Sequence, residues 1–135
     1  MDIKDDSVNK KREFNILMAL KQGYETGDFE NVAAYLTDSS IFESQWVLEP
    51  LVGKTDIMTY LRGKGETLKK YNALAFGDFI VYPGGIFLRL TQKDDDKVNE
   101  PIAIVTELDD EGMVSRIDLC DIRLFLDESE INQGE

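Results

Sequence analysis

The spacing of hydrophobic and polar positions changes once along the chain, near residue 72. Before that point apolar residues recur every three or four positions, which is the period of an amphipathic helix. After it they alternate with polar residues, which is the period of a strand. The pattern therefore predicts helices first and strands last. Helices are predicted over about 10–25 and 28–37 and from Thr55, with a strand over 41–47, and later strands over about 73–82, 86–92, 100–109 and 113–125.

Short local signals mark the ends of these elements. Gly27 suits the left-handed conformation that ends a helix, and the carboxylate of Asp28 can cap the helix that follows. Residues 49–52, which include a proline, are expected to form a loop before the third helix. Gly63 and Gly65 each weaken that helix by about 1 kcal/mol relative to alanine, so we expect it to bend or fray there.

The order of the elements indicates an α+β fold. In the order α-α-β-α-β-β-β-β, three N-terminal helices are expected to pack on a strongly curved antiparallel sheet, forming a cone with an internal pocket. Residues 1–9 are polar and are expected to be flexible, and residues 10–126 to form a single domain. The acidic tail, 127–135, is expected to be disordered.

Composition narrows the classes of function. Fifteen lysine and arginine residues against 27 acidic ones leave a net charge of −12, which would repel the phosphates of a nucleic acid. No stretch approaches the ~20 consecutive apolar residues of a membrane span and the first residues lack the apolar core of a signal peptide, so we expect a cytoplasmic protein with no membrane partner. The chain has no histidine and a single cysteine, Cys120, so imidazole bases, His-rich metal sites and intrachain disulfides are excluded. Any chemistry must use carboxylates, tyrosines, lysines or the backbone, and we expect neither a cofactor nor a metal.

Four stretches at the junctions between the predicted elements carry a family resemblance. They are Tyr24–Phe29 (YETGDF), Tyr35–Glu43 (YLTDSSIFE), Leu51–Ile57 (LVGKTDI) and Gly112–Ile117 (GMVSRI). They resemble the nuclear transport factor 2-like superfamily, which includes ketosteroid isomerases and SnoaL-like polyketide cyclases. The resemblance covers about residues 10–126 and implies the cystatin-like cone. That scaffold hosts isomerases, cyclases, dehydratases, non-catalytic binders and subunit partners, so the resemblance implies the fold more strongly than the function.

The resemblance implies only part of an isomerase site. Glu43 falls where the isomerases place the carboxylate that shuttles a proton, at the end of the first strand. Their oxyanion tyrosine falls near Leu20 and their protonated carboxylic acid near Ile104, so both hydrogen-bond donors are missing. Loss of one oxyanion-hole donor can cost ~2.7–4 kcal/mol of transition-state stabilisation. Standard ketosteroid isomerase activity is therefore not expected.

The resemblance also implies which side chains line the pocket. The catalytic candidates are Glu43 as base, Asp121 as acid or orienting group, and Tyr60 as hydrogen-bond donor. If the two carboxylates converge, burial and mutual repulsion raise at least one of their pKa values. In the alternative, Glu43 caps an amide or pairs with a lysine, and Asp121 lies at a solvated strand end. The ligand-binding candidates are Ile41, Trp46, Ile102, Ile104, Thr106, Ile117 and Leu119, of which Trp46 could instead pack in the core or a subunit contact.

Two kinds of function stay open. The first is a homodimer, joined through its sheet, that binds a small apolar or carbonyl-containing molecule. Such a protein could also be an enzyme that catalyses cofactor-independent isomerase, cyclase or lyase chemistry. The second is a non-catalytic protein-interaction or dimerisation module whose pocket is filled by its own side chains. The dimer is motivated by apolar residues on both strand faces, such as Phe87 next to Leu88 and Val105 next to Ile104. An open pocket favours the first function and a filled one favours the second.

Overall fold

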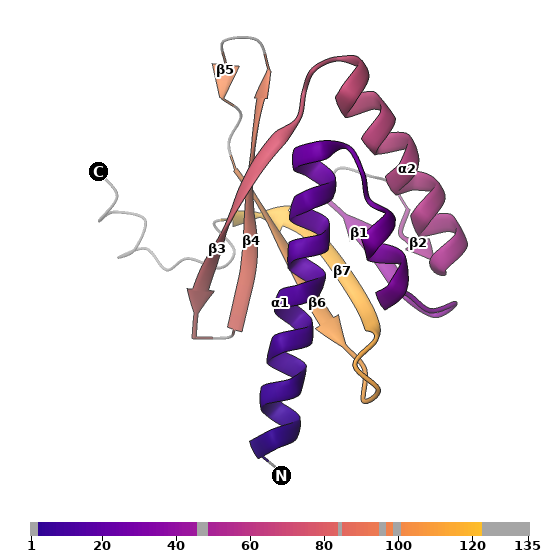
Figure 1. Cartoon of the computed structure of the whole chain (residues 1–135), viewed down its shortest axis with the longest axis vertical. Coiled ribbons are helices and arrows are strands. Elements are labelled where there is room, and N and C mark those ends of the chain that lie inside the picture. The colour runs from indigo at the N-terminus through magenta and orange to yellow at the C-terminus, as the bar shows by residue number, and fades with distance from the viewer. Residues whose placement is uncertain (1–2, 46–48, 84, 95–96, 99–100, 123–135) are drawn as a thin grey trace.

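The computed structural model describes residues 3–45, 49–83, 85–94, 97–98 and 101–122. Helices precede most of the strands along the chain, as Figure 1 shows. In chain order the elements are α1 (Ile3–Thr26), the 3₁₀ helix η1 (Glu30–Tyr35), β1 (Ile41–Ser44), β2 (Leu51–Val52), α2 (Lys54–Lys70), β3 (Ala75–Tyr82), β4 (Gly85–Asp94), β5 (Lys97–Val98), β6 (Ile102–Leu108) and β7 (Val114–Asp121).

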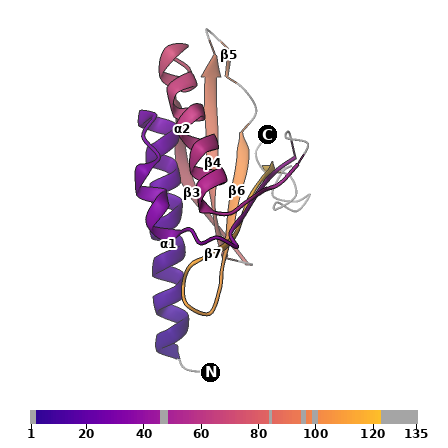
Figure 2. The same ribbon diagram turned by 90° about the vertical axis from the view of Figure 1, so that its right-hand side faces the viewer.

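The helices form a layer on one face of the sheet (Figure 2). The strand order is β2-β1-β7-β6-β4-β3, and β5 pairs with β4. Strand β1 runs parallel to β7, whereas the other pairs among the described strands are antiparallel. The predicted α+β class is therefore confirmed, and its single parallel pair makes the sheet mixed rather than wholly antiparallel.

Several boundaries differ from the prediction. Helix α1 begins at Ile3 rather than near residue 10, because a helix that is already packed extends at low cost into a polar segment. The second helix is a short 3₁₀ helix, and residues 51–52 pair with β1 instead of forming a loop. Strand β5 was not predicted, since two residues leave no periodic signal. The proposed division into residues 10–126 and a tail stays a prediction, and the tail 127–135 lies outside the described residues.

Helix α1 packs on the inner face of the sheet, by which we mean the face turned toward the helices. Its Ile16, Leu17 and Leu20 are fully buried and share one core with Leu88 of β4 and Ile104 of β6. Burial of a leucine or isoleucine side chain contributes about 1.5–3 kcal/mol to stability. This contact positions α1 along the sheet and decides which face of each strand is the inner one.

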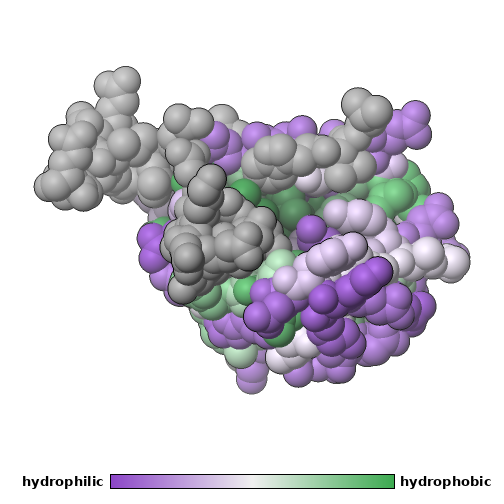
Figure 3. Space-filling view, turned by 90° about the horizontal axis from the view of Figure 1, so that it is seen from above, coloured by the Kyte–Doolittle hydropathy of each residue, from purple (hydrophilic) through white to green (hydrophobic). Residues whose placement is uncertain are grey.

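The outer surface of the helix layer is hydrophilic. Seen from above, hydrophilic residues dominate the helix side of the molecule, and hydrophobic residues gather in the middle of the view (Figure 3). On this surface Arg62 of α2 donates to Glu30 of η1, with Nε and Oε2 2.8 Å apart. The basic residues of α2 therefore belong to a solvated helix surface, and one of them is already paired.

The junction between α1 and η1 is built as predicted. Gly27 has a φ of +82°, which is the left-handed conformation that glycine adopts without strain. The carboxylate of Asp28 accepts the N–H of Glu30 at 3.0 Å, which satisfies one of the free amides at the start of η1. The chain can therefore reverse here and bring η1 back beside α1.

Helix α2 passes close to this junction at Gly65. A Cβ on Gly65 would lie 2.2 Å from the carbonyl oxygen of Gly27, whereas a Cβ on Gly63 would meet no atom within 4 Å. The helix continues through both glycines from Lys54 to Lys70, so neither of them ends it. Gly65 is required by the packing and Gly63 is not.

This difference predicts opposite effects for two glycine-to-alanine changes in one helix. Gly65→Ala should lower the free energy of unfolding by about 1–3 kcal/mol, because the new methyl group overlaps the backbone of Gly27. Gly63→Ala is the matched control and should raise it by about 0.5–1 kcal/mol, because alanine loses less backbone entropy on folding. Urea denaturation of both variants measures these values. Equal effects of the same sign would contradict the packing role of Gly65.

Candidate functional site

Strand register decides which of the predicted site residues can meet. Phe42 of β1 and Ile117 of β7 are partners and both are buried, so they lie on the inner face. Side chains alternate along a strand, and Glu43 and its partner Asp118 therefore lie on the outer face. Asp121 follows Ile117 by four positions on β7 and returns to the inner side. Glu43 and Asp121 therefore lie on opposite faces of the sheet, and the condition for a coupled acid–base pair, that the two carboxylates converge, is not met here.

Glu43 is engaged in an ion-pair cluster on the outer face. The guanidinium of Arg116 donates to Glu43 and also to Asp118, the latter with Nη2 and Oδ1 2.9 Å apart. The hydrogen bonds to Asp118 and Glu43 raise the pKa of Arg116. The side chain of Glu43 is 49% exposed, so this pairing contributes only about 0–1 kcal/mol. Glu43 has the charged partner foreseen in the alternative, although it is an arginine rather than a lysine.

The other two catalytic candidates lie apart from Glu43. The backbone N–H of Asp121 donates to Oε1 of Gln45 at 3.0 Å. Tyr60 of α2 is half-buried, its ring centroid lies 5.3 Å from that of Phe42, and burial raises the pKa of its hydroxyl. The catalytic roles of Glu43, Asp121 and Tyr60 stay predictions, and the geometry does not unite them in one site.

Most of the predicted ligand-binding residues lie in the core. Ile104 and Ile117 are fully buried, Leu119 is nearly so, and Ile102 packs against the same core. Ile41 lies on the outer face beside Glu43, and Trp46 lies outside the described residues. Thr106 is different, because it lines a pocket. The ligand-binding roles of all seven residues stay predictions.

That pocket has a volume of about 800 Å³ and opens between the start of α1, the turn joining β3 to β4, and the end of β6. Its walls combine apolar side chains with a few polar ones, which is the usual composition of a small-molecule site. It is lined by Lys10, Glu13, Phe14, Val81, Tyr82, Pro83, Gly85, Ile86, Thr106, Glu107 and Leu108.

Two polar groups in this pocket have no partner within the described part of the chain. Thr106 is only 5% exposed and its Oγ1 makes no hydrogen bond there. Glu13 is half-buried, and its carboxyl forms no hydrogen bond or ion pair with any described residue. Burial raises the pKa of Glu13. A buried polar group without a partner is uncommon and requires an explanation, and a missing ligand or water is one.

Tyr82 adds a third polar group at the end of β3. Its ring centroid lies 5.5 Å from that of Phe87, which is fully buried. Burial raises the pKa of Tyr82, and the nearby charges of Glu13 and Cys120 raise it further. The tyrosine hydroxyl is therefore neutral at physiological pH and can donate a hydrogen bond.

Arg12 joins α1 to two other segments of the chain. Its Nε donates to the carbonyl oxygen of Gly112 at 2.7 Å, which ties α1 to the turn that follows β6. Its guanidinium carbon lies 5.3 Å from the ring centroid of Tyr35 in η1, within the range of a cation–π contact. These two contacts help to fix the position of α1.

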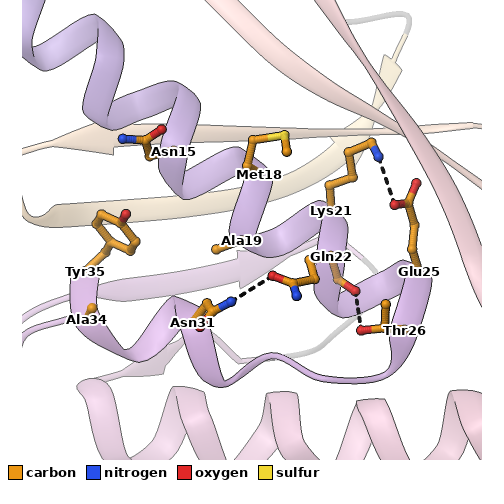
Figure 4. Close-up of a pocket in the computed structure, with 10 residues that line it drawn as sticks. All are labelled: Asn15, Met18, Ala19, Lys21, Gln22, Glu25, Thr26, Asn31, Ala34 and Tyr35. Atoms are coloured by element: carbon orange, nitrogen blue, oxygen red, sulfur yellow. Dashed lines mark hydrogen bonds and ion pairs between the residues drawn. The ribbon is translucent and has the colours of Figure 1, made fainter.

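A second pocket of about 570 Å³ lies between α1 and η1, and Figure 4 shows its lining. Four of its polar side chains form two bonded pairs. Lys21 and Glu25 form an ion pair at 2.8 Å, and Nδ2 of Asn31 donates to Oε1 of Gln22 at 2.8 Å. Because these groups are already paired, this pocket offers less to a ligand than the one that contains Thr106.

The described residues restrict the chemistry further. No group of three His, Cys, Asp or Glu side chains among them is placed to hold a metal ion. Burial raises the pKa of Cys120 to about 11, so its thiol is protonated at neutral pH and is a poor nucleophile. Among the described residues, no helix is long and apolar enough to cross a membrane.

Sequence reasoning identified Thr106 but missed Glu13 and Tyr82. Glu13 sits in a helix next to Phe14, and a charged residue there looks like part of the solvated side of an amphipathic helix. Tyr82 ends a strand beside a turn, where exposure is the default expectation. For Thr106 the sequence did contain a signal. In the alternating row Ile102, Ile104 and Thr106, a polar residue stands where an apolar one is expected.

Comparison with known proteins identifies the fold. No family model and no curated protein matches the sequence. A protein of Xanthomonas campestris pv. campestris assigned as a polyketide cyclase has a TM-score of 0.58 at 12% identity, with 82% of this chain and 90% of that chain covered. A protein of Agrobacterium tumefaciens assigned as an isomerase of the SnoaL-like family has a TM-score of 0.57 at 12% identity, with 81% and 96% covered. A de novo designed protein with a curved β-sheet has a TM-score of 0.61 at 12% identity, with 91% and 93% covered.

Identities this low show a shared architecture and leave the activity open. The designed protein also shows that this architecture forms without a natural function. Other matching structures include an NTF2-like protein of Cytophaga hutchinsonii and a protein with a cystatin-like fold. The chain has the cystatin-like α+β fold of the nuclear transport factor 2-like superfamily, as its sequence predicts.

Proposed function

We propose that this protein binds a small, largely apolar molecule in the pocket between the start of α1 and the end of β6. The observation that carries the proposal is the hydroxyl of Thr106, which is buried, lines the pocket and has no partner within the described residues. A ligand atom that bonds with this hydroxyl would supply the missing partner. The apolar body of the ligand would lie against Phe14, Ile86 and Leu108.

The energetics favour an occupant. A buried hydroxyl without a hydrogen bond costs about 1–3 kcal/mol, and no described residue supplies a partner for Thr106 Oγ1. The pocket, at about 800 Å³, lies within the usual size range of small-molecule sites. Binding would relieve the cost at Thr106 and remove apolar wall from water at the same time.

Cofactor-independent isomerase, cyclase or lyase chemistry is the extension of this proposal. The support for it is a similarity of fold to two proteins, one assigned as a polyketide cyclase and the other as a SnoaL-like isomerase. In this pocket the half-buried carboxyl group that could transfer a proton is that of Glu13, with Tyr82 as a neutral hydrogen-bond donor. Glu43 would have to act outside this pocket.

The second candidate function is a non-catalytic interaction or dimerisation module. The observation that favours it is the filled interior at Ile104 and Ile117, two of the residues expected to line a hollow. In this alternative the pocket at Thr106 is a packing defect, and the protein acts through its surfaces. The two functions differ in whether a change at Thr106 affects the binding of a small molecule.

A homodimer joined through the outer face of the sheet is also part of the proposal. The inner face is covered by the helices, and the outer face carries exposed and half-buried apolar side chains beside its ion pairs. Phe76 is 57% exposed and shares the outer face with Asp78, whose carboxylate accepts from Nε of Arg89 at 2.9 Å. Val105 and Ile80 lie on the same face and are half-buried. Pairing with a second copy would remove this surface from water.

Thr106→Val tests the binding site, because it removes the hydroxyl and nearly preserves the side-chain shape. It should weaken binding of prodan, a neutral and fluorescent naphthyl ketone, by about 0.5–1.5 kcal/mol, or roughly two- to tenfold in Kd. It should also raise the free energy of unfolding of the ligand-free protein by about 1 kcal/mol, because an unpaired buried hydroxyl is gone. Fluorescence titration and urea denaturation measure the two effects.

Thr106→Ser is the matched control for this change, since it keeps the hydroxyl and loses only a methyl group. It should bind prodan more tightly than Thr106→Val while being less stable. Prodan binding that is the same in wild type and in Thr106→Val would refute the proposed pocket and favour the interaction module.

Phe76→Glu tests the dimer. A charge on the exposed part of the outer face should convert the dimer to a monomer, because a carboxylate is costly to bury in an apolar contact. Val52→Glu is the control, since Val52 is equally exposed, at 55%, but lies on β2 at the other edge of the sheet. Light scattering at micromolar concentration measures both. A wild-type protein that is monomeric at this concentration would refute the dimer proposal.

A further inference from the structure

The pocket of the proposed function presents its two unpaired polar groups from opposite walls. Glu13 comes from α1 in the helix layer, and Thr106 comes from β6 in the sheet. Their chemistries differ, because a hydroxyl can donate or accept a hydrogen bond and an ionised carboxylate can only accept. The protonation state of Glu13 therefore decides which ligands this site can bind.

Three charged or titratable groups share the pocket with Glu13. Lys10 lies one turn earlier on α1 and is exposed, so water screens its effect on Glu13, and it has an interaction of its own. Glu107 of β6 also lines the pocket, but it follows Thr106 along the strand and pairs with Arg116, so its side chain is directed to the outer face. Tyr82 of β3 is neutral and can donate a hydrogen bond to either form.

Burial is the factor that dominates at Glu13. The carboxyl is half-buried between α1 and the turn of β3 and β4, where its Oε1 lies 4.0 Å from the position that a Cβ on Gly85 would occupy. No described cation pairs with it, so nothing in this part of the chain offsets the loss of hydration of the anion. Burial accordingly raises the pKa of Glu13 above its ordinary value.

We propose that the ligand is uncharged and presents a carbonyl or hydroxyl oxygen to the protonated carboxyl of Glu13, and that the site rejects carboxylates. This inference rests on the proposed function. Protonated Glu13 donates its O–H to the ligand oxygen, and Thr106 bonds with a second polar atom or with the same one. The site then binds neutral, oxygen-bearing molecules selectively.

A carboxylate ligand would lose hydration in this pocket, as the anion of Glu13 does. Lys10 is the cation among the described lining residues, and it is exposed. The net charge of −12 adds repulsion at longer range. A neutral ketone meets neither effect.

The proposal links affinity to pH with a definite sign. Binding requires the protonated form of Glu13, so it is complete below the pKa of Glu13 and is lost as the pH rises through that value. Above the pKa, the affinity for a neutral ligand should fall about tenfold for each pH unit. Replacement of Glu13 by glutamine should remove this dependence, because an amide donates a hydrogen bond at every pH.

The test is a fluorescence titration of prodan from about pH 5 to about pH 8, where free glutamic acid is already ionised. Wild type should lose affinity as the pH rises, and Glu13→Gln should bind with nearly constant affinity. Glu107→Gln is the matched control, since it removes a carboxylate from the rim of the same pocket and should keep the slope. At neutral pH the analogue of prodan in which a carboxylate replaces the ketone should bind at least tenfold more weakly than prodan.

A flat wild-type profile, an unchanged slope in Glu13→Gln, or equal binding of the ketone and the carboxylate would each overturn the proposal. The proposed function would survive those results provided that Thr106→Val still weakens prodan binding. If prodan does not bind at any pH, or binds equally well to wild type and to Thr106→Val, both this proposal and the proposed function are overturned. The wild-type profile and the carboxylate comparison need no variant, so the test stands even where Glu13→Gln folds poorly.

Discussion

The packing of α1 on the sheet is the interaction on which the rest of the structure depends. Leu17 and Leu20 of α1 meet Leu88 and Ile104 in one fully buried core, and this contact decides which face of every strand is the inner one. Because side chains alternate along a strand, a shift of one residue would exchange the two faces. With Phe42 in the core, its neighbour Glu43 must point outward, whatever chemistry a carboxylate at that position performs in other proteins of this fold.

The candidate site forms where this core ends. The inner row of β6 runs from Ile102 through Ile104 to Thr106, and the core is complete at Ile104. At Thr106 the apolar contacts give way to a pocket, and the hydroxyl is enclosed without a partner. Near this end of the sheet, Arg12 joins α1 to the turn after β6 through Gly112. A hydrogen bond between residues so distant in sequence leaves no trace in local periodicity.

The fold could be predicted from the sequence because its main signal is a change of period, which local chemistry determines. The turn at Gly27 was predictable for the same reason, since only its own backbone conformation matters. The faces of β1 were not predictable, because Ile41 and Phe42 are both apolar and either could enter the core. Glu13 was not predictable as a site residue either. Its environment is made by the turn of β3 and β4 and the end of β6, which only the tertiary structure brings to α1.

A designed protein shares this architecture, so the architecture by itself is no evidence for a function. Evidence must come from side chains that the fold does not need and that reduce its stability. Ile104 and Leu20 contribute to stability, and their presence is explained by the core alone. Thr106 and Glu13 are different, because burial of a hydroxyl and partial burial of a carboxyl without described partners do not favour folding. An isoleucine at position 106 would continue the apolar row of β6, so the core alone does not explain the threonine found there.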